Sequence, residues 1–276
     1  MTISAQVVED SISNNIRLTT FKLVMPMTLV REFNTHRMFS RSASSSRAIP
    51  VATMLKEVTE NPVVPIYWGK NEPGMQSYQE LEPEVKEQAL KVWNEARDSA
   101  VKYASQLSEL GVHKQYANLL LDPFTWIRVV VTATEWDNFF TLRLHETAKP
   151  EIRALAQEMR KAMDASTPVE RVSAADPDVV EREDVWHLPF ITKEERQTLP
   201  VKTLLQVSTA RCARTSYNKH DGTPSEVEAD VKLFEKLVNS VPPHPSPAEH
   251  QAVFISQGNM YANFRGWASL RFSLQI

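Results

Sequence analysis

The sequence predicts an α+β fold in which helices dominate and a few strands complete the core. Residues 83–110 and 150–163 place apolar side chains every three to four positions, which is typical of amphipathic helices. Residues 15–25 mix apolar and β-branched side chains in rough alternation, which favours a strand. These three segments indicate a helix-rich protein with a small amount of sheet.

Shorter elements fill the intervals between these segments. Pro26 suits the first turn of a short helix that ends near Arg37, and a second short helix is expected to begin at Pro50. Residues 63–76 have the composition of a loop. Residues 124–142 are apolar nearly all round, so we expect one long buried helix in the core of the domain or of an oligomer.

The second half of the chain contains a helix and a polar segment. A helix is expected over residues 223–240, opened by Pro224 and by a capping box of Ser225 and Glu228. Residues 164–184 are polar, acidic and punctuated by proline. We therefore expect a surface excursion over residues 164–199.

The composition limits the classes of function. The 276 residues are 42% hydrophobic and 24% charged, which is enough for one large domain or two small ones. The formal net charge of -3 provides no global positive field for polymeric nucleic acid or anionic lipid, so any phosphate must be held locally. No apolar run has the length of a membrane span, and the N-terminal residues lack the layout of a secretion signal. We expect a cytoplasmic protein.

Cysteine and glycine usage exclude several kinds of site. The single Cys212 excludes an intramolecular disulfide and a multi-cysteine metal site, and we expect a small buried thiol rather than a nucleophile. None of the six glycines is spaced as GxGxxG or as GxxxxGK followed by Ser or Thr. A bound nucleotide is therefore expected to be held by side chains.

Near the C-terminal end, Trp267 and Arg271 could serve a site, although a packed tryptophan is the commoner case.

The stretch NTHRMFSRSASSSRAIP, residues 34–50, carries the densest cluster of polar groups. Between His36 and Arg47 it contains three arginines and five serines and no acid. Composition alone is compatible with a solvated serine-arginine loop of an RNA-binding protein. Packing residues such as Phe39 favour an ordered site instead, and arginine forks with serine hydroxyls suit a phosphate group. The residues themselves leave both interpretations open.

Two further polar clusters stand out. Asn138 and Arg143 lie in an otherwise apolar segment, where they could also be the polar edge of a buried helix. His244 and His250 flank Glu249 with a spacing that matches no standard zinc pattern, so no metal site is expected.

Four segments taken together resemble the flavin-dependent thymidylate synthases. THRMFSRSASSSR (35–47) resembles the family signature RHRxxSxNExSxR, and NFFTLR (138–143) is similar to the family's N-F-x-x-L-R helix. ARTSY (213–217) resembles A-R-x-S-F/Y, and HPSPAEH (244–250) resembles H-x-S/T-P-x-E-H. The resemblance covers most of the chain outside residues 164–199.

The order of these segments differs from that of the family. In most of the family the last two segments precede the arginine-serine signature, whereas here they follow it. The resemblance therefore implies a circular permutation, similar to that of a phage and bacterial branch, in which the strand that should follow His250 opens the chain. It also implies a single catalytic domain over residues 1–276, with helices around a small, mostly antiparallel sheet.

The resemblance implies a homotetramer that methylates dUMP at C5, with methylenetetrahydrofolate as carbon donor, NADPH as reductant and FAD as mediator. Carried over by motif position, the residues lining the flavin would be His36, Arg37, Asn138, Ser216 and His250. The residues holding the nucleotide, chiefly its phosphate, would be Ser45, Ser46 and Arg47. Arg143 would be the catalytic residue, facing the pyrimidine and favouring its N3-ionised form, because a fixed guanidinium stabilises developing negative charge.

The chain departs from the family pattern at five positions, one of which is Glu32, where glutamine is usual. Thr35 replaces the first signature arginine, and Ser42 and Ala43 replace the asparagine-glutamate pair. Leu119 lies where an arginine contacting phosphate is common, so Arg41 or another residue would have to take its place. These departures leave two alternatives to dUMP methylation. The same flavin chemistry could methylate or hydroxymethylate another pyrimidine nucleotide such as dCMP, or the chain could be a non-catalytic flavin- or nucleotide-binding relative.

Overall fold

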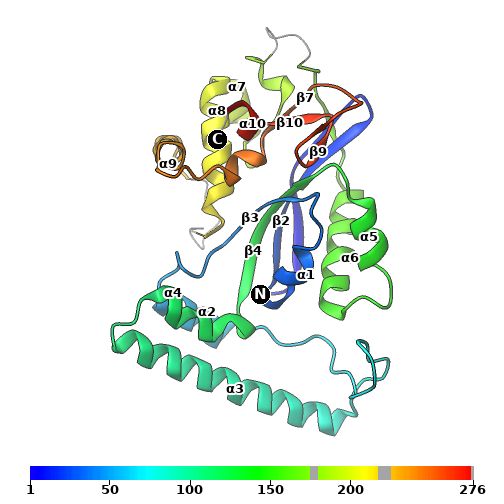
Figure 1. Cartoon of the computed structure of the whole chain (residues 1–276), viewed down its shortest axis with the longest axis vertical. Coiled ribbons are helices and arrows are strands. Elements are labelled where there is room, and N and C mark those ends of the chain that lie inside the picture. Colours follow the sequence, from blue (N-terminus) through cyan, green and yellow to red (C-terminus); the bar gives the residue numbers. More distant parts are fainter. Residues whose placement is uncertain (175–179, 217–224, 275–276) are drawn as a thin grey trace.

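The computed structural model describes residues 1–174, 180–216 and 225–274, and its centre is a five-stranded sheet (Figure 1). The strands lie in the order β3-β4-β2-β1-β5, and all neighbours are antiparallel except β1 and β5. Their bounds are β1 Ser4–Ser13, β2 Ile16–Pro26, β3 Ser40–Ala43, β4 Trp126–Ala133 and β5 Val169–Glu170. This arrangement confirms the predicted α+β fold with a mostly antiparallel sheet.

Two asparagines set the hairpin between β1 and β2. Asn14 and Asn15 have φ angles of 47° and 64°, in the left-handed region that asparagine tolerates better than most residues. Two successive residues of positive φ make a turn whose twist matches that of the flanking strands. The strand predicted over residues 15–25 is confirmed as β2.

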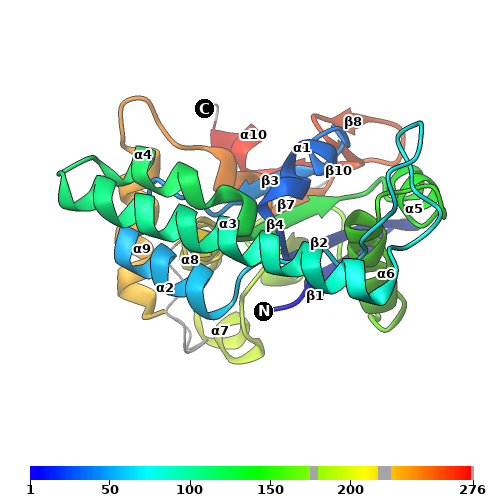
Figure 2. The same ribbon diagram turned by 90° about the horizontal axis from the view of Figure 1, so that it is seen from below.

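Helices and two smaller sheets surround the central sheet (Figures 1 and 2). The helices are α1 Val30–Phe33, α2 Val51–Glu60, α3 Pro83–Glu109, α4 Lys114–Ala117, α5 Asp137–Arg143, α6 Pro150–Asp164, α7 Lys193–Thr198, α8 Val201–Ala213, α9 Val227–Val238 and α10 Leu270–Leu274. The smaller sheets join β10 (Trp267–Ser269), β7 (Ala252–Phe254) and β6 (Trp186–His187), and β8 (Met260–Tyr261) with β9 (Phe264–Arg265). The helices predicted over 83–110 and 150–163 and the short helix after Pro50 are confirmed, whereas the helical segment after Pro26 ends at Phe33 and does not extend to Arg37. In the part of the chain that the structure describes, no helix has the length and apolar character needed to cross a bilayer.

The central sheet separates two different layers. On one face, Phe21, Leu23 and Val131 pack against α1, α5 and α6 in the main apolar core. On the other face, Leu18 packs with Trp267 beside a row of buried polar side chains. The tryptophan is fully buried, as expected from its residue type. Both smaller sheets and α8 lie on the side of this polar row (Figure 1).

The long buried helix predicted over residues 124–142 is wrong. Residues 126–133 form β4, which pairs with β2 on one side and β3 on the other, and only residues 137–143 form a helix, α5. A central strand covered on both faces is apolar all round, as a buried helix is, so periodicity cannot separate the two. The run of β-branched residues from Ile127 to Thr132 was the signal that favours a strand.

The surface excursion expected over residues 164–199 is wrong over much of its length. Near its start, β5 joins the central sheet and Arg171 is 7% exposed. A single turn of 3₁₀ helix, Glu183–Val185, then leads into β6 (Trp186–His187), and residues 186–188 are at most 3% exposed. The segment therefore returns to the interior and supplies one strand of the second sheet. The acidic and proline-rich composition that suggested an excursion belongs to residues 164–184.

The capping box predicted for α9 is also wrong. The helix begins at Val227, after Ser225, and has no side-chain cap. The Ser225 hydroxyl instead contacts both carboxylate oxygens of Asp230, at 2.7 and 2.6 Å. This carboxylate is fully buried and also pairs with two arginines, the partners that a buried charge requires. The Ser225 hydroxyl therefore binds the Asp230 carboxylate and does not cap the helix.

Gly266, between β9 and β10, has a conformation and surroundings that exclude a side chain. Its φ is 75°, and an added Cβ would lie 2.7 Å from Phe254 Cε2 and 2.9 Å from the carbonyl oxygen of Ser256. We expect Gly266→Ala to lower the free energy of unfolding by about 1–3 kcal/mol, as measured in urea. Gly258→Ala is the matched control, because an added Cβ there meets no atom within 4 Å. Equal losses in the two variants would contradict this prediction.

Candidate active site

Arg143 and His36, which belong to separate motifs, are in direct contact. Arg143 is the last residue of α5, and its Nε donates to Nε2 of His36 at 2.9 Å. Its Nη2 donates to Oγ1 of Thr35 at 3.3 Å. The structure thus brings the arginine-serine signature against the 138–143 segment. Thr35 accepts a hydrogen bond where the usual family arginine would place a second positive charge.

Aromatic packing fixes the ring of His36. The ring lies edge-on to Phe139 with centroids 4.9 Å apart and is stacked on Phe39 with centroids 5.7 Å apart. Burial, followed by the charges of Arg143 and Arg41, lowers the pKa of His36 from 6.5 to about 4. The ring is therefore neutral at neutral pH. Because Nε2 accepts a hydrogen bond, the single ring proton is on Nδ1.

The depressed pKa of His36 makes stability dependent on pH. Above pH 6.5 the ring is neutral in the folded and the unfolded chain, whereas between pH 6.5 and about 4 only the unfolded chain binds the proton. The free energy of unfolding therefore falls as the pH falls through this window. We expect a shallower decrease of Tm over the window in His36→Gln than in the unmodified protein, measured by calorimetry. The exposed His145→Gln is the control, and an unchanged slope in His36→Gln would contradict the prediction.

His250 lies behind β3 and contacts Ser42. Its Nε2 is 3.0 Å from Oγ of Ser42, and its Nδ1 is 2.9 Å from Oγ1 of Thr132. The ring is fully buried, and burial lowers its pKa to about 3. Both polar atoms of the ring are thus occupied within the chain. The predicted role of His250 at the flavin stays a prediction, and in this arrangement it would act through Ser42.

Ser45, Ser46 and Arg47 follow β3 at its other end. The amide of Asn118 donates to the carbonyl oxygen of Ser46 at 2.8 Å, and Lys114 Nζ donates to that of Ala48 at 2.9 Å. The two serines are partly exposed and Arg47 is exposed. The backbone of the segment is therefore anchored, while the side chain of Arg47 faces solvent. No hydrogen bond or ion pair to Arg47 is found among the described residues.

The remaining predicted flavin residues divide into two groups. Arg37 and Asn138 are exposed, and in the described part of the chain neither side chain has a hydrogen-bonding partner. Ser216 ends the 3₁₀ turn Arg214–Ser216, but its side chain lies outside the part that the structure describes. Tyr217, the last residue of the matching segment, also lies outside the described residues.

One chain does not bring all the predicted residues together. His36 and Arg143 lie before the start of β3, next to α5, whereas residues 45–47 lie beyond its end, next to α2 and α4. Figures 1 and 2 show α5 and α2 at opposite ends of the sheet. Arg143 and the 45–47 segment of one chain are therefore two separate half-sites.

Arg41 does not replace the arginine that is missing at Leu119. Its Nη1 lies 3.4 Å from the carbonyl oxygens of Phe33 and His36, so the side chain turns back toward the end of α1. Burial lowers its pKa. Leu119 is half exposed beside the segment that carries residues 45–47. Lys114 and Arg47 are among the cations on that side of β3.

A cavity of 820 Å³ opens beside Arg143. Its lining includes Glu32, Tyr67, Gln76, Tyr78, Arg143 and Arg153. This volume lies in the range of small-molecule sites in proteins, and its lining mixes aromatic rings with a few charged groups. The predicted loop over residues 63–76 supplies part of the wall.

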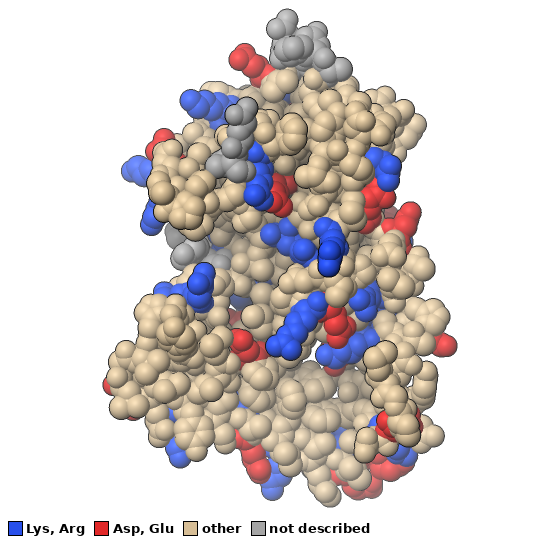
Figure 3. All heavy atoms as spheres, viewed as in Figure 1, with Lys and Arg blue, Asp and Glu red and all other residues tan. Residues whose placement is uncertain are grey.

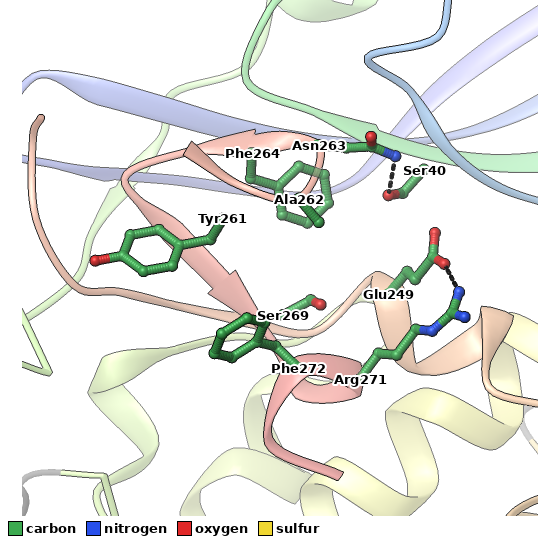
Figure 4. Close-up of a pocket in the computed structure, with 9 residues that line it drawn as sticks. All are labelled: Ser40, Glu249, Tyr261, Ala262, Asn263, Phe264, Ser269, Arg271 and Phe272. Carbon is green, nitrogen blue, oxygen red and sulfur yellow. Dashed lines mark hydrogen bonds and ion pairs between the residues drawn. The ribbon is translucent and has the colours of Figure 1, made fainter. Parts of the chain in front are cut away.

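A second cavity, of 340 Å³, lies at the beginning of β3 (Figure 4). Glu249 and Arg271 form an ion pair on one side of it. On the other side, the rings of Tyr261 and Phe272 meet edge to face with centroids 6.3 Å apart. The sequence did not assign a role to Arg271. The motif over residues 244–250 includes Glu249, so it was the sequence feature that indicated a site near this cavity.

Two other expectations have clear outcomes. The serine-arginine loop interpretation is wrong for Ser40 to Ala43, which form β3 with Ser40 and Ser42 buried. Cys212 is confirmed as a buried thiol whose pKa is raised by burial. Within the described residues, no three histidine, cysteine or acidic side chains lie in a group that could hold a metal ion.

Figure 3 shows acidic and basic side chains intermixed, with several basic groups across the middle of the molecule.

The comparison with protein families decides the assignment of the chain. The family model described as thymidylate synthase complementing protein matches residues 16–169, which is more than half of the chain. The chain belongs to this family. The match begins in β2 and includes the segments 35–47 and 138–143, whereas the segments 213–217 and 244–250 lie outside it. Membership of this thymidylate synthase family supports a nucleotide methyltransferase that acts on C5 of a pyrimidine nucleotide.

Solved structures give a more distant likeness. The chain is similar to crystal structures of a UMP/dUMP methylase PolB from Streptomyces cacaoi bound with 5-Br dUMP and with 5-Br UMP. The identities are 18% and 19%, the alignments cover 58% of this chain and 89% and 88% of those chains, and both TM-scores are 0.47. A comparison with curated proteins finds no match.

Proposed function

We propose that the protein methylates dUMP at C5 to give dTMP, with methylenetetrahydrofolate as carbon donor, NADPH as reductant and FAD as cofactor. The observation that carries the proposal is the contact between Arg143 and His36, two residues of separate family motifs that lie 107 positions apart. Membership of the family, through a match that includes both segments, supports it.

The charge of Arg143 is available for a pyrimidine. Its partners are a neutral imidazole and a hydroxyl, and no carboxylate in the described residues pairs with it. Two of its five N–H donors are used, which leaves the others for a ligand. A guanidinium that is held in place but not neutralised stabilises negative charge developing on the pyrimidine. Arg143 would thus favour the N3-ionised form of the nucleotide and prepare C5 for attack on the carbon donor.

The residues present suit FAD, which is held here without a glycine-rich turn. Arg37 and Asn138 are exposed and without partners in the described chain, and they flank the His36–Arg143 contact in sequence. A guanidinium and an amide are suitable donors for pyrophosphate and ring carbonyl oxygens. When bound, FAD would carry electrons from NADPH to the carbon that the folate donates. Ser216 and His250 complete the proposed flavin set.

We further propose that the complete site forms between chains of a homotetramer. Ser45, Ser46 and Arg47 would hold the nucleotide phosphate, yet they lie at the end of β3 away from Arg143. A second chain that brings its own 45–47 segment beside Arg143 would unite the two half-sites. Exposed apolar residues along α3, among them Val85, Val92 and Tyr103, support an association of chains.

The circular permutation remains part of the proposal. The family match begins at residue 16, in the strand that follows the E-H segment in other members. The segment 244–250, which should precede that strand, comes near the C-terminal end yet places His250 against β3 and β4. A chain whose order is permuted but whose contacts are kept has both properties.

Two departures keep alternative functions open. Ala43 is exposed where the family has a carboxylate near the nucleotide, and Leu119 is exposed where an arginine is common. These changes favour testing dCMP beside dUMP, with a methyl or a hydroxymethyl product. They also favour testing the class of non-catalytic flavin- or nucleotide-binding relatives.

The visible spectrum of the purified protein, followed during turnover, tests the proposal. We expect flavin absorbance that NADPH bleaches and that returns under anaerobic conditions only when methylenetetrahydrofolate and the nucleotide are both added. A yellow protein whose flavin does not return to the oxidised form would favour the non-catalytic relative. A colourless protein that binds no added FAD would refute the proposal.

A further inference from the structure

A row of polar side chains crosses the interior between the central sheet and the second sheet. It runs over β3, β4, β2 and β1, on the face opposite the main apolar core. In spatial order its members are Ser42, His250, Thr132, Thr20, His187, Ser11 and Arg171. Each member is at most 8% exposed. The proposed reaction gives no role to the last five.

Every member is hydrogen-bonded to the next one. From Ser42 inward, the first three distances are 3.0 Å (Ser42 Oγ to His250 Nε2), 2.9 Å (His250 Nδ1 to Thr132 Oγ1) and 2.6 Å (Thr132 Oγ1 to Thr20 Oγ1). The next three are 2.7 Å (Thr20 Oγ1 to His187 Nε2), 2.9 Å (His187 Nδ1 to Ser11 Oγ) and 3.2 Å (Ser11 Oγ to Arg171 Nε). An unbroken chain therefore joins Arg171 to β3.

Both histidines of the row are neutral. His187 and His250 are fully buried, and each ring contacts two hydroxyl groups and no carboxylate among the described residues. Burial, followed by the charges of Arg171 and Arg196, lowers the pKa of His187 well below its usual value. A neutral imidazole has one nitrogen that donates and one that accepts. If one nitrogen of a ring accepts a hydrogen bond, the other nitrogen must therefore donate one. The protonation of one nitrogen thus fixes the hydrogen bonds on both sides of the ring.

Arg171 and Ser11 set that direction. Arg171 Nη2 donates to Oε1 of Glu9 at 2.6 Å, and its Nε can only donate to Ser11. Ser11 is fully buried, and in the described chain the only acceptor within reach of its hydroxyl proton is Nδ1 of His187. If His187 Nδ1 carried the proton instead, the Ser11 proton would be buried without an acceptor. An unpaired buried donor is strongly unfavourable, because it has lost its hydrogen bond to water without gaining another.

The direction then passes along the whole row. Because Nδ1 of His187 accepts, its Nε2 donates to Thr20, which leaves the Thr20 proton for Thr132. The Thr132 proton goes to Nδ1 of His250, so Nε2 of His250 donates to Ser42. Among the described residues, the one proton of the row without a partner is then that of Ser42, which is 8% exposed and belongs to β3. The opposite direction would leave the unpaired proton on the fully buried Ser11.

We propose that Ser11, His187, Thr20 and Thr132 are positioning residues that hold His250 in the tautomer protonated on Nε2. Through this tautomer they make Ser42 a hydrogen-bond donor to an acceptor atom of a ligand at β3, such as a ring carbonyl oxygen. His250 thereby orients a serine and transfers no proton itself. The identity of the ligand rests on the proposed function, whereas the tautomers do not depend on it.

Neutron diffraction from crystals of the deuterated full-length protein tests the tautomers without any ligand. We expect deuterium on Nε2 of both His187 and His250, none on either Nδ1, and the Ser11 deuterium directed at His187. Deuterium on Nδ1 of either ring, or on both nitrogens of one ring, would overturn the proposal.

Ser11→Asp tests the transmission across the sheet. A carboxylate beside Arg171 can only accept, so it requires a proton on His187 Nδ1 and reverses every bond as far as Ser42. We expect the deuterium of both rings to move to Nδ1, while Ser11→Thr, which keeps the hydroxyl, retains the original tautomers. An unchanged His250 in a folded Ser11→Asp protein would overturn the proposal. If this variant does not fold, the map of the unmodified protein decides alone.

The ligand side is tested by titration with FAD and with dUMP. We expect Ser42→Ala to bind one of these probes about tenfold more weakly, the loss of one hydrogen bond, and Ser42→Thr to keep the affinity. Equal affinities of Ser42→Ala and the unmodified protein for both probes would refute the donor role of Ser42. If the unmodified protein binds neither probe, the proposed function fails, and the neutron result still decides the tautomers.

Discussion

Replacing Arg143 by alanine is expected to reduce turnover by about a hundred- to a thousand-fold, the usual effect of removing one preorganised group that stabilises developing charge. The Nε and Nη2 bonds to His36 and Thr35 fix the guanidinium without neutralising it. The variant should keep its flavin absorbance, because other residues of the proposed flavin set remain. Steady-state kinetics and the visible spectrum of the same sample measure both effects.

Two further variants make this test specific. Arg143→Lys keeps the charge but loses the planar fork that reaches both acceptors, so we expect an activity between those of alanine and arginine. Arg182→Ala is the control, because this exposed arginine pairs with nearby Asp184 among the described residues and lies outside both cavities. Full activity in Arg143→Ala would contradict the assignment of the catalytic residue.

Replacing Arg47 by alanine is expected to raise the KM for the nucleotide by about 10- to 100-fold, with a much smaller change in kcat. The loss of a charge-assisted hydrogen bond to phosphate, about 1.5–3 kcal/mol, gives this range. Arg47 is exposed, and the backbone before it is anchored through Asn118, so the guanidinium is free to meet a phosphate. Lys56→Ala, which removes an exposed cation from the neighbouring α2, is the control. A KM unchanged from that of the unmodified protein would contradict the role of Arg47.

The two variants together test whether sites form between chains. If Arg143 and Arg47 of one site come from different chains, a mixed oligomer of Arg143→Ala and Arg47→Ala protein contains some sites with both arginines intact. Random mixing of equal amounts should then restore roughly a quarter of the native sites. Activity is measured at a nucleotide concentration far below the KM of Arg47→Ala, where each variant alone has low activity. If both arginines came from one chain, every site in the mixture would lack one of them, and the activity would not exceed that of the separate variants.

Local patterns predicted much of the fold. The amphipathic spacing in 83–110 and 150–163 and the alternation in 15–25 gave α3, α6 and β2, because these elements each present one face to the core. The pattern failed for 124–142, where β4 is buried on both faces and shows no periodicity. It also failed for residues 185–188, because the polar stretch before them conceals a short strand that becomes buried only through pairing with β7.

The candidate site was predicted in its residues but not in its geometry. Motif positions named His36, Arg143, Ser45 and Arg47, yet no spacing rule shows that the first two meet while the last two lie at the far end of β3. The row from Arg171 to Ser42 was not foreseen. Its members come from β1 to β4, from the segment 244–250 and from the supposed excursion. Motif positions singled out Ser42 and His250, whereas the other five look in sequence like ordinary strand or surface residues.

The mass of the nucleotide product tests the central claim most directly. Purified protein would be incubated with methylenetetrahydrofolate, NADPH and FAD together with dUMP or, separately, dCMP, and the nucleotides would be analysed by mass spectrometry. We predict that dUMP gains one methyl group and becomes dTMP, and that omission of the folate prevents the change. A hydroxymethyl product, or a gain on dCMP alone, would replace dUMP methylation by the alternative C5 chemistry. No change in the mass of either nucleotide, with active flavin present, would contradict the account.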